Sequence, residues 1–390
     1  MCSAPLRSVP NAIQAPLDHT GVVPRRWGWR LLGLLVSLVV ATLALTGAVA
    51  GTARFVSRAI SRDEDGPSVA TPPAGTYYHG VYPGGRTGWE DDITAGDLDA
   101  YEQAVGREAA WVYFSDNWFR DRDFPVETAT WIRERGAIPV IRLMLRGRDP
   151  AATDETYRLQ HILDGDFDRD LAAWGRDAAA FGSPIVVEWG TEMNGRWFGW
   201  NARWNGRADG ARRFRQAYRH IERTIEGAGA DNITWAWHVN GDSVPDTPWN
   251  QIDRYYPGDR FVDWVGLSAY GALTPADQAG DWRPFRETLD EVVPELTEIA
   301  PDKPIMVFEF GMTRGSPSGT PAAFADAALD DLLANRWPAV RGFSWWNETW
   351  PNDDDPAHDT DMRVQALGGV RRAFRDHLVG NDDVLDHPFP

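Results

Sequence analysis

The sequence predicts an α/β fold, a single (β/α)8 TIM barrel preceded by one N-terminal transmembrane helix. Short β-rich runs alternate with longer helical stretches after Tyr77, and one uncharged apolar run precedes them. Such alternation is typical of βα units in a parallel sheet, and eight strands over roughly 300 residues match a closed barrel. A doubly wound open sheet is disfavoured, because Gly84-Gly85 lacks the glycine spacing of a dinucleotide-binding loop.

Eight hydrophobic runs supply the expected strands. They are Tyr78–Tyr82, Ala110–Ser115, Ile138–Leu143, Ile185–Gly190, Ile233–Val239, Val262–Tyr270, Ile305–Phe310 and Gly342–Trp346. Helical stretches between them include Phe167–Phe181, Ala211–Ala228, Phe285–Ile299 and Ala322–Asn335. Residues 77–378 are therefore predicted to form the barrel, and residues 379–390 a C-terminal tail.

The first 60 residues differ in charge from the rest. They hold six arginines and one acid, so their formal net charge is +5. Because the whole chain has a net charge of −18, the remaining residues carry −23. Residues 31–53 contain no charged side chain, and about 20 apolar residues suffice to span a membrane. The arginines before this run predict a cytoplasmic tail at residues 1–30.

These features predict a transmembrane anchor at residues 31–53, a polar Pro- and Gly-containing linker at 54–76, and a barrel outside the cytoplasm. The alternative is a secreted domain released by cleavage near Ala50, because Ala48-Val49-Ala50 has the small-x-small pattern of a signal-peptide site. In either case the acidic domain works at or beyond the cell surface.

Composition narrows the partners of the exported domain. Hydrophobic residues make up 43% and charged residues 25%, which argues against a mainly disordered chain. The acidic charge argues against a nucleic-acid partner. The single cysteine, Cys2, excludes an internal disulfide framework and a thiolate metal cluster. No metal or cofactor is expected, and the chain is expected to be monomeric. The 20 tryptophans either build a large core or line a sugar site.

Two glutamates occupy the predicted C-terminal ends of strands, where barrel enzymes place their active sites. Glu192 follows the fourth run in VEWGTEMNGRWFGW, and Glu309 lies at the end of the seventh in PIMVFEFGM. Breaking a glycosidic bond requires one carboxyl to protonate the leaving oxygen and another to attack or to activate water. The pair therefore predicts a glycoside hydrolase with Glu192 and Glu309 as catalytic residues.

Side chains near the same strand ends are predicted to bind the polysaccharide substrate, chiefly by stacking on sugar rings. They are Trp197, Tyr270, Trp346, Trp345, Trp200, Trp118 and Asn194. For Trp200 and Trp118, packing within their loops is an equal alternative.

The blocks TEMNGRWFGW and FEFG resemble glycoside hydrolase family 26, the β-mannanase-like endoglycanases of a retaining clan of (β/α)8 barrels. The resemblance extends from Tyr77 to about Trp350, with further blocks such as WVYFSDNWF and ITWAWHVN in family order. It implies that Glu192 is the acid/base, that Glu309 is the nucleophile, and that Tyr270 hydrogen-bonds the nucleophile. It also implies sugar stacking on Trp197 and on Trp346 or Trp345.

The sequence departs from the mannanases of this family at two places. These mannanases usually carry a histidine directly before the acid/base glutamate, where this chain has Thr191. They usually carry a second histidine after the third strand, where this chain has Arg142 and Arg146. A β-glucan or a mixed exopolysaccharide is therefore expected alongside β-mannan and glucomannan. A non-catalytic surface glycan-binding barrel and a transglycosylase acting on the producer's own exopolysaccharide are alternatives. Glu188 is expected to form an ion pair with Arg142.

The implied mechanism is retaining double displacement. It requires an ionised Glu309 to attack the anomeric carbon while Glu192 donates a proton to the departing sugar. The sequence-based expectation is that Glu192 has the higher pKa and that donors such as Tyr270 keep Glu309 charged.

Overall fold

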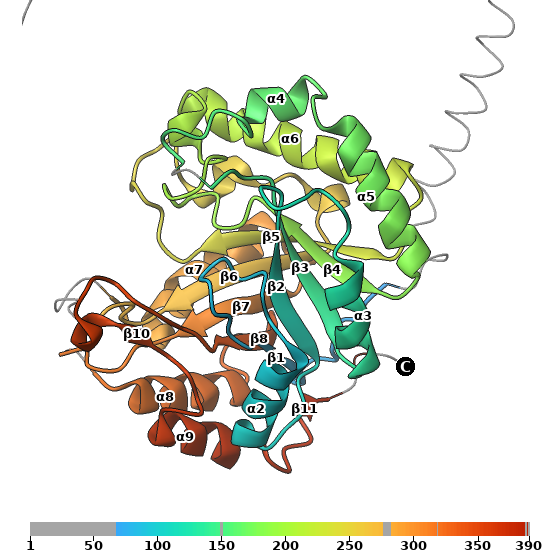
Figure 1. The fold of residues 1–390 in the computed structure, drawn as a ribbon. Helices are drawn as coiled ribbons and strands as arrows, with labels where there is room; N and C mark the ends of the chain where they lie inside the picture. The colour runs from blue at the N-terminus through green and yellow to red at the C-terminus, as the bar shows by residue number, and fades with distance from the viewer. Residues whose placement is uncertain (1–67, 149–150, 276–281, 318, 387, 389–390) are drawn as a thin grey trace, which may run out of the picture. The chain divides into compact units, whose positions relative to one another are not determined.

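Eight parallel strands form a closed barrel in the computed structural model, which describes residues 68–148, 151–275, 282–317, 319–386 and 388 (Figure 1). Neighbouring strands pair in chain order, and the first strand also pairs with the eighth, which closes the sheet. This confirms the predicted barrel, and each predicted run overlaps one strand. The strands are β1 (Tyr77–Tyr82), β2 (Trp111–Asn117), β3 (Ile138–Met144), β4 (Ile185–Trp189), β5 (Ile233–Asn240), β6 (Trp264–Tyr270), β7 (Ile305–Gly311) and β8 (Val340–Trp346).

Helices separate most of the strands and cover the outside of the barrel (Figure 1). The four predicted helices are confirmed as α5, α6, α7 and α8, with ends within three residues of those expected. Only the short 3-10 helices η2 (Ile252–Tyr255) and η3 (Asp259–Phe261) lie between β5 and β6. The α-helices are α2 (Ala95–Val105), α3 (Val126–Glu134), α4 (Leu159–Leu163), α5 (Asp168–Phe181), α6 (Ala208–Gly227), α7 (Phe285–Ile299), α8 (Pro321–Leu333) and α9 (Gly368–Leu378).

Three short strands add to the barrel. β9 (Thr349–Trp350) and β10 (Thr360–Asp361) form an antiparallel pair directly after β8. β11 (Val384–Leu385) lies within the predicted C-terminal tail and pairs in parallel with the start of β1. Val69, in the predicted linker, is buried, and its backbone N–H donates to Thr234 Oγ1 over 3.1 Å. Parts of the predicted tail and linker therefore pack on the barrel.

The predicted cytoplasmic tail and the predicted anchor at 31–53 lie outside the described residues, as does most of the predicted linker. Within the described part of the chain, no helix combines the length and the apolar character that crossing a membrane requires.

The lower half of the barrel interior is packed with aromatic rings. Trp111 on β2 makes an edge-on contact with Phe308 on β7, with ring centroids 5.8 Å apart. Its ring occupies the space left by Gly342 on β8, where a Cβ atom would lie 2.5 Å from the indole. Close packing of this kind is what fills a barrel and makes it a core instead of a pore. The polar side chains described below lie above this layer, towards the C-terminal ends of the strands.

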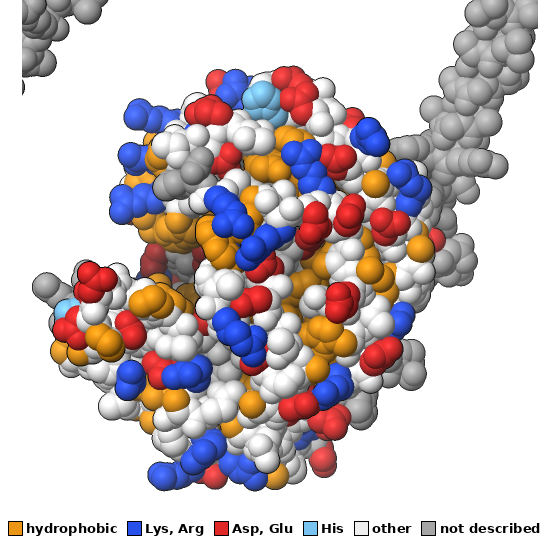
Figure 2. All heavy atoms as spheres, viewed as in Figure 1, with side chains coloured by type: hydrophobic (Ala, Val, Ile, Leu, Met, Phe, Trp, Pro, Cys, Tyr) orange, Lys and Arg blue, Asp and Glu red, His pale blue; other side chains and the backbone are white. Residues whose placement is uncertain are grey.

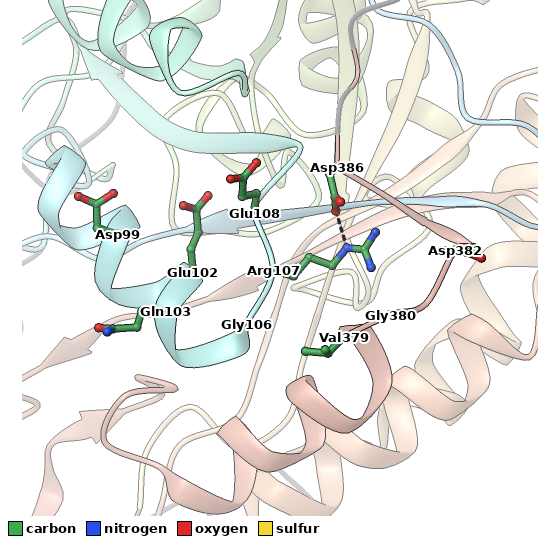
Figure 3. A pocket seen from close by; sticks show the side chains of 10 residues that line it. All are labelled: Asp99, Glu102, Gln103, Gly106, Arg107, Glu108, Val379, Gly380, Asp382 and Asp386. Atoms are coloured by element: carbon green, nitrogen blue, oxygen red, sulfur yellow. Dashed lines mark hydrogen bonds and ion pairs between the residues drawn. The ribbon is translucent and has the colours of Figure 1, made fainter.

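A cavity of about 660 Å³ lies at the N-terminal end of the barrel (Figure 3). Arg107 extends across it, and its guanidinium donates to the backbone oxygens of Leu378 and Asn381 over 2.7 and 2.9 Å and pairs with Asp386. The arginine therefore fastens the segment after α9 to the base of the barrel. This is a structural role at the end opposite the strand termini where barrel active sites form.

Candidate active site

Glu309 enters the barrel because β7 contains a bulge. Gly266 pairs with Met306 and Ser268 pairs with Glu309, so two residues along β6 correspond to three along β7. A bulge breaks the alternation of side chains and redirects one of them. Phe308 and Glu309 consequently both reach the barrel interior, Phe308 beside the ring of Tyr113 and Glu309 within reach of its hydroxyl.

Both carboxylate oxygens of the buried Glu309 have polar neighbours. The Tyr270 hydroxyl donates to Oε2 over 2.8 Å and the Tyr113 hydroxyl to Oε1 over 3.3 Å. Arg142 Nη2 lies 3.4 Å from Oε1. The predicted hydrogen bond between Tyr270 and Glu309 is therefore present. These contacts fix the orientation of the carboxyl.

Burial nevertheless raises the pKa of Glu309 to about 7, although Arg142 acts to lower it and Glu192 adds to the rise. This corrects the expectation that hydrogen-bond donors would hold Glu309 fully ionised, because desolvation outweighs them. The influence of Glu192 on this pKa also shows that the two carboxylates lie within electrostatic range of each other. Near neutral pH, the free protein therefore contains both ionisation states of Glu309.

Glu192 lies just beyond β4 in a strained backbone conformation. Its φ of 49° falls in the left-handed region, which side chains other than glycine rarely adopt and which functional sites often contain. Its backbone N–H donates to His238 O over 2.9 Å, which fixes the turn. Trp197 Nε1 donates to Glu192 Oε2 over 2.7 Å. The Trp197 ring, 42% exposed, lies against Gly195, where a Cβ atom would be 2.2 Å away.

A buried ion-pair network lies beneath these two glutamates. Glu188 Oε2 is 2.6 Å from His238 Nδ1, and Glu188 Oε1 is 3.7 Å from Arg142 Nε, which confirms the predicted pairing with Arg142. Tyr113 also donates to Glu188. Burial alone would raise the pKa of Glu188, but His238, Arg142 and Tyr113 together outweigh it, so the pKa is lowered. Burial alone would lower the pKa of His238, but Glu188 raises it.

Sequence reasoning assigned no role to two further carboxylates at this end of the barrel. Glu90, in the loop after β1, lies 2.5 Å from Arg142 Nη1. Glu348, two residues after β8, accepts hydrogen bonds from Trp346 Nε1 over 3.0 Å and from Tyr82 over 3.3 Å. Burial raises the pKa of Glu348 to about 8, and Glu90 adds to this rise. For Glu348, its position directly after the eighth strand was the available signal, whereas Glu90 lies well beyond the end of β1 and carried no such signal.

Trp346 and Trp345 separate to opposite sides of β8, as the alternation of strand side chains requires. Trp346 stacks on Tyr82 with ring centroids 4.1 Å apart and meets Tyr270 edge-on at 6.5 Å, so it lies at the predicted site. Trp345 is fully buried outside the barrel, packs edge-on against Phe310 at 5.1 Å, and donates to a backbone oxygen. Its predicted role in substrate binding is therefore wrong.

The comparison with known proteins agrees with this arrangement. Residues 151–306 match the model of glycosyl hydrolase family 26. Over these residues the chain is similar to glycosyl hydrolase family 26. It is 24% identical to Endoglucanase H of Acetivibrio thermocellus over 304 residues, which are 78% of this chain and 31% of that protein. It is 29% identical to a beta-1,3-xylanase of an Alcaligenes species over 255 residues, covering 59% and 50% of the two chains.

A mannan endo-1,4-beta-mannosidase of Bacillus subtilis is 29% identical over 160 residues, 40% of this chain and 37% of that protein. The matches span half or less of the length of these curated relatives. Among solved structures, a family 26 beta-mannanase from Bacteroides ovatus has a TM-score of 0.56 at 17% identity, covering 80% of this chain and 90% of that one. This structural likeness supports the barrel fold.

Three other residues that the sequence placed in the family 26 site are instead buried within loops. Trp200 donates to Thr191 O over 2.8 Å, and Trp118 packs edge-on against two aromatic rings near α4. Asn194 donates to Asn240 O and accepts from Asn240 N, over 2.8 and 2.9 Å. Each is at most 3% exposed, so these residues shape the loops and are not available to stack on or bind a sugar.

Figure 2 shows a hollow on the side of the domain where the β9–β10 hairpin lies, with basic side chains along its other edge. Of the seven predicted substrate-binding residues, the structure brings Trp197, Tyr270 and Trp346 to the two glutamates. The arrangement combines a partly exposed tryptophan on one carboxyl and a buried, oriented second carboxyl, which are the components that glycosidic cleavage needs.

Proposed function

We propose that this domain is an endo-acting glycoside hydrolase that cleaves a β-linked polysaccharide with retention of anomeric configuration. The observation that carries the proposal is the position of Glu309: the β7 bulge turns it into the barrel, where Tyr270 and Arg142 orient it within electrostatic range of Glu192. A carboxyl held in this way is suited to attack, and the second carboxyl is suited to proton transfer.

In the proposed first step, the Glu309 carboxylate forms a bond to the anomeric carbon as the bond to the leaving oxygen breaks. Glu192 gives its proton to that oxygen, so that the departing sugar leaves as a neutral alcohol. In the second step, Glu192 takes a proton from water, the water oxygen bonds to the anomeric carbon, and Glu309 is released as a carboxylate. Tyr270 and Arg142 stabilise the charge on Glu309 at the start and at the end of the cycle.

The substrate we propose is a β-mannan, a glucomannan or a β-glucan. The relatives described above are an endoglucanase, a beta-1,3-xylanase and a mannan endo-1,4-beta-mannosidase. The sugar-binding surface proposed for this chain comprises Trp197, which is exposed beside Glu192, and Trp346, which stacks on Tyr82. Aromatic faces of this kind bind the apolar faces of sugar rings.

A panel of polysaccharides tests the proposal: glucomannan, β-mannan, mixed-linkage β-glucan and β-1,3-xylan, each incubated with the full chain in detergent. We expect shortened products from at least one polymer, and none with Glu309→Ala or Glu192→Ala. Glu298→Ala, at an exposed position on α7, is the matched control and should retain activity. Products that persist in Glu309→Ala would overturn the assignment of the nucleophile. Binding without products from any polymer would indicate a glycan-binding barrel. Products longer than the substrate would indicate a transglycosylase.

We also propose that residues 31–53 anchor the chain in the membrane with the barrel outside the cytoplasm. Sequence alone supports this, through the uncharged run and the arginines before it. Protease treatment of intact cells should degrade the barrel and leave a membrane-bound N-terminal fragment. A soluble extracellular protein that begins just after Ala50 would instead establish cleavage of a signal peptide.

A further inference from the structure

Arg146 lies on the loop after β3, held between aromatic rings at the mouth of the barrel. Its guanidinium carbon is 5.2 Å from the ring centroid of Trp89 and 5.9 Å from that of Phe198. Its Nε donates to Asn117 Oδ1 over 2.9 Å. These contacts fix the side chain in a partly buried position and leave Nη1 and Nη2 without a hydrogen-bond partner among the described residues.

Arg146 has no direct counter-ion in the described part of the chain. Its neighbour Arg142 lies within 4 Å of three glutamates, Glu90, Glu188 and Glu309. No described carboxylate lies within ion-pair distance of Arg146. Burial lowers the pKa of Arg146 and Arg142 adds to this fall, while the charges of Glu90 and Asp91 oppose it. A partly buried cation without a direct ion pair is incompletely satisfied, which leaves Arg146 able to bind an external anion.

The position of Arg146 relative to the catalytic residues favours a substrate group as that anion. Arg142, which contacts Glu309, lies 5.5 Å from the centroid of the same Phe198 ring that Arg146 faces. Arg146 is therefore connected to the proposed nucleophile through the Phe198 ring and Arg142. Further along the same loop, Arg148 is exposed over the Phe119 ring at 4.9 Å and forms no ion pair with a described carboxylate. Two arginines without a direct ion pair to a described carboxylate, Arg146 and Arg148, thus lie on the loop after β3.

We propose that Arg146 binds the carboxylate of an acidic sugar unit, so that the substrate is a β-glycan that carries uronic acid residues. The inference rests on the proposed function and narrows its substrate class. A guanidinium donates two parallel hydrogen bonds to a carboxylate, and the free Nη1 and Nη2 provide such a pair.

Binding to chemically matched polymers tests this inference without relying on turnover. Glucomannan and mixed-linkage β-glucan are each used in three forms: native, partly oxidised at C6 to the carboxylate, and oxidised then reduced back to the alcohol. The full chain carrying Glu309→Ala, which removes the proposed nucleophile, is titrated with each form at low and high salt. We expect the oxidised form of at least one polymer to bind about 10- to 100-fold more tightly than the other two forms, as charged hydrogen bonds predict.

The variant Arg146→Gln, added to Glu309→Ala, should abolish that preference, and Arg146→Lys should reduce it because a lysine cannot make the paired contact. Arg372→Gln, at an exposed position on α9, should leave it unchanged. Thermal melting of each variant determines whether it is folded. If Arg146→Gln is not folded, Arg146→Lys serves as the test.

Equal binding of oxidised and reduced polymers, or a preference that survives both Arg146 variants, would overturn the inference. Binding of a sulfated glucomannan as tight as that of the oxidised form would overturn the assignment to a carboxylate. Failure of the unmutated chain to cleave any polymer would overturn the proposed function, but it would leave this binding result standing. The two proposals therefore fail in distinguishable ways.

Discussion

Tyr270 at the end of β6 donates a hydrogen bond to Glu309 Oε2 on β7 over 2.8 Å. The two residues belong to neighbouring strands, and the bulge in β7 brings the carboxyl to the hydroxyl. Burial raises the pKa of Tyr270 well above its ordinary value, and Glu309 adds to this, so the phenol remains a donor throughout the working pH range. The contact orients the carboxylate that the proposed mechanism uses to attack.

Removing this donor should weaken catalysis. Tyr270→Phe should lower kcat/KM by about 10- to 100-fold, the range for one hydrogen bond to a charged group. It should also move the acidic limb of the pH profile to higher pH, because the hydroxyl favours the ionised carboxyl. Tyr256→Phe, which removes a surface hydrogen bond to Asp259, is the control. An acidic limb that does not move would show that Tyr270 does not act on Glu309.

The pH dependence of the unmodified protein follows from the burial of Glu309. Its pKa is raised to about 7, and the attacking form is the carboxylate. We therefore expect kcat/KM to fall as the pH decreases through about 7, measured with any polymer that the protein cleaves. A rate that stays constant down to pH 5 would contradict this assignment.

The raised pKa of Glu309 also predicts that its ionisation lowers the stability of the folded protein. The folded pKa of Glu309 lies above its ordinary value of 4.5, so ionising this group destabilises the fold increasingly as the pH rises from 4.5 to about 7. Glu309→Gln should therefore be more stable than the parent above pH 7, by about 1–3 kcal/mol, and the difference should vanish below pH 4.5. Urea unfolding at pH 4.5 and pH 8 measures this. A variant that is less stable at pH 8 would show that the contacts of Glu309 outweigh its burial.

The Glu188–His238 pair should act in a different pH window. The lowered pKa of Glu188 contributes stability that is lost as the pH falls below 4.5. The raised pKa of His238 contributes stability that is complete below 6.5 and is lost as the pH rises through the folded value. Glu188→Gln should therefore lower the free energy of unfolding most between pH 4.5 and pH 6.5, by about 3–5 kcal/mol, and less at pH 9. A loss of stability that is independent of pH would contradict this.

The two tryptophans of β8 should respond in opposite ways to substitution. Trp346→Ala should raise KM, because Trp346 lies beside Tyr270 at the proposed sugar-binding surface. Trp345→Phe should lower the melting temperature without changing KM, because Trp345 packs between the barrel and its outer helices. Steady-state kinetics and thermal melting on both variants measure this. A rise in KM in Trp345→Phe alone would reverse the assignment.

Strand order and the two glutamates could be predicted because they depend on local pattern: eight apolar runs, and a carboxyl at the end of two of them. Side-chain direction could not always be predicted. The bulge at Glu309 changes the alternation on β7, and no residue in PIMVFEFG marks it. The pairing of Arg142 with Glu90 depends on a loop after β1 that crosses to β3, a contact that sequence spacing does not contain.

The burial of Trp200 and Trp118 illustrates a second limit. Both follow strand ends, as residues of a binding surface do, but Trp200 packs within its own loop and Trp118 packs against Tyr157 and Phe167 on either side of α4. The sequence alone does not distinguish a loop tryptophan that packs within the fold from one that binds a sugar. The path of the backbone decides which role the ring takes. Trp197 remains exposed because its indole lies across Gly195 and donates to Glu192.

The anomeric configuration of the first product tests the central claim most directly. A polymer that the protein cleaves is followed by proton NMR from the first minutes of reaction, before the sugar equilibrates between its anomers. Double displacement through Glu309 predicts that the β-anomer appears first and that the α-anomer grows in later by mutarotation. Initial release of the α-anomer would mean a single displacement by water, and would contradict the role of Glu309 as a nucleophile.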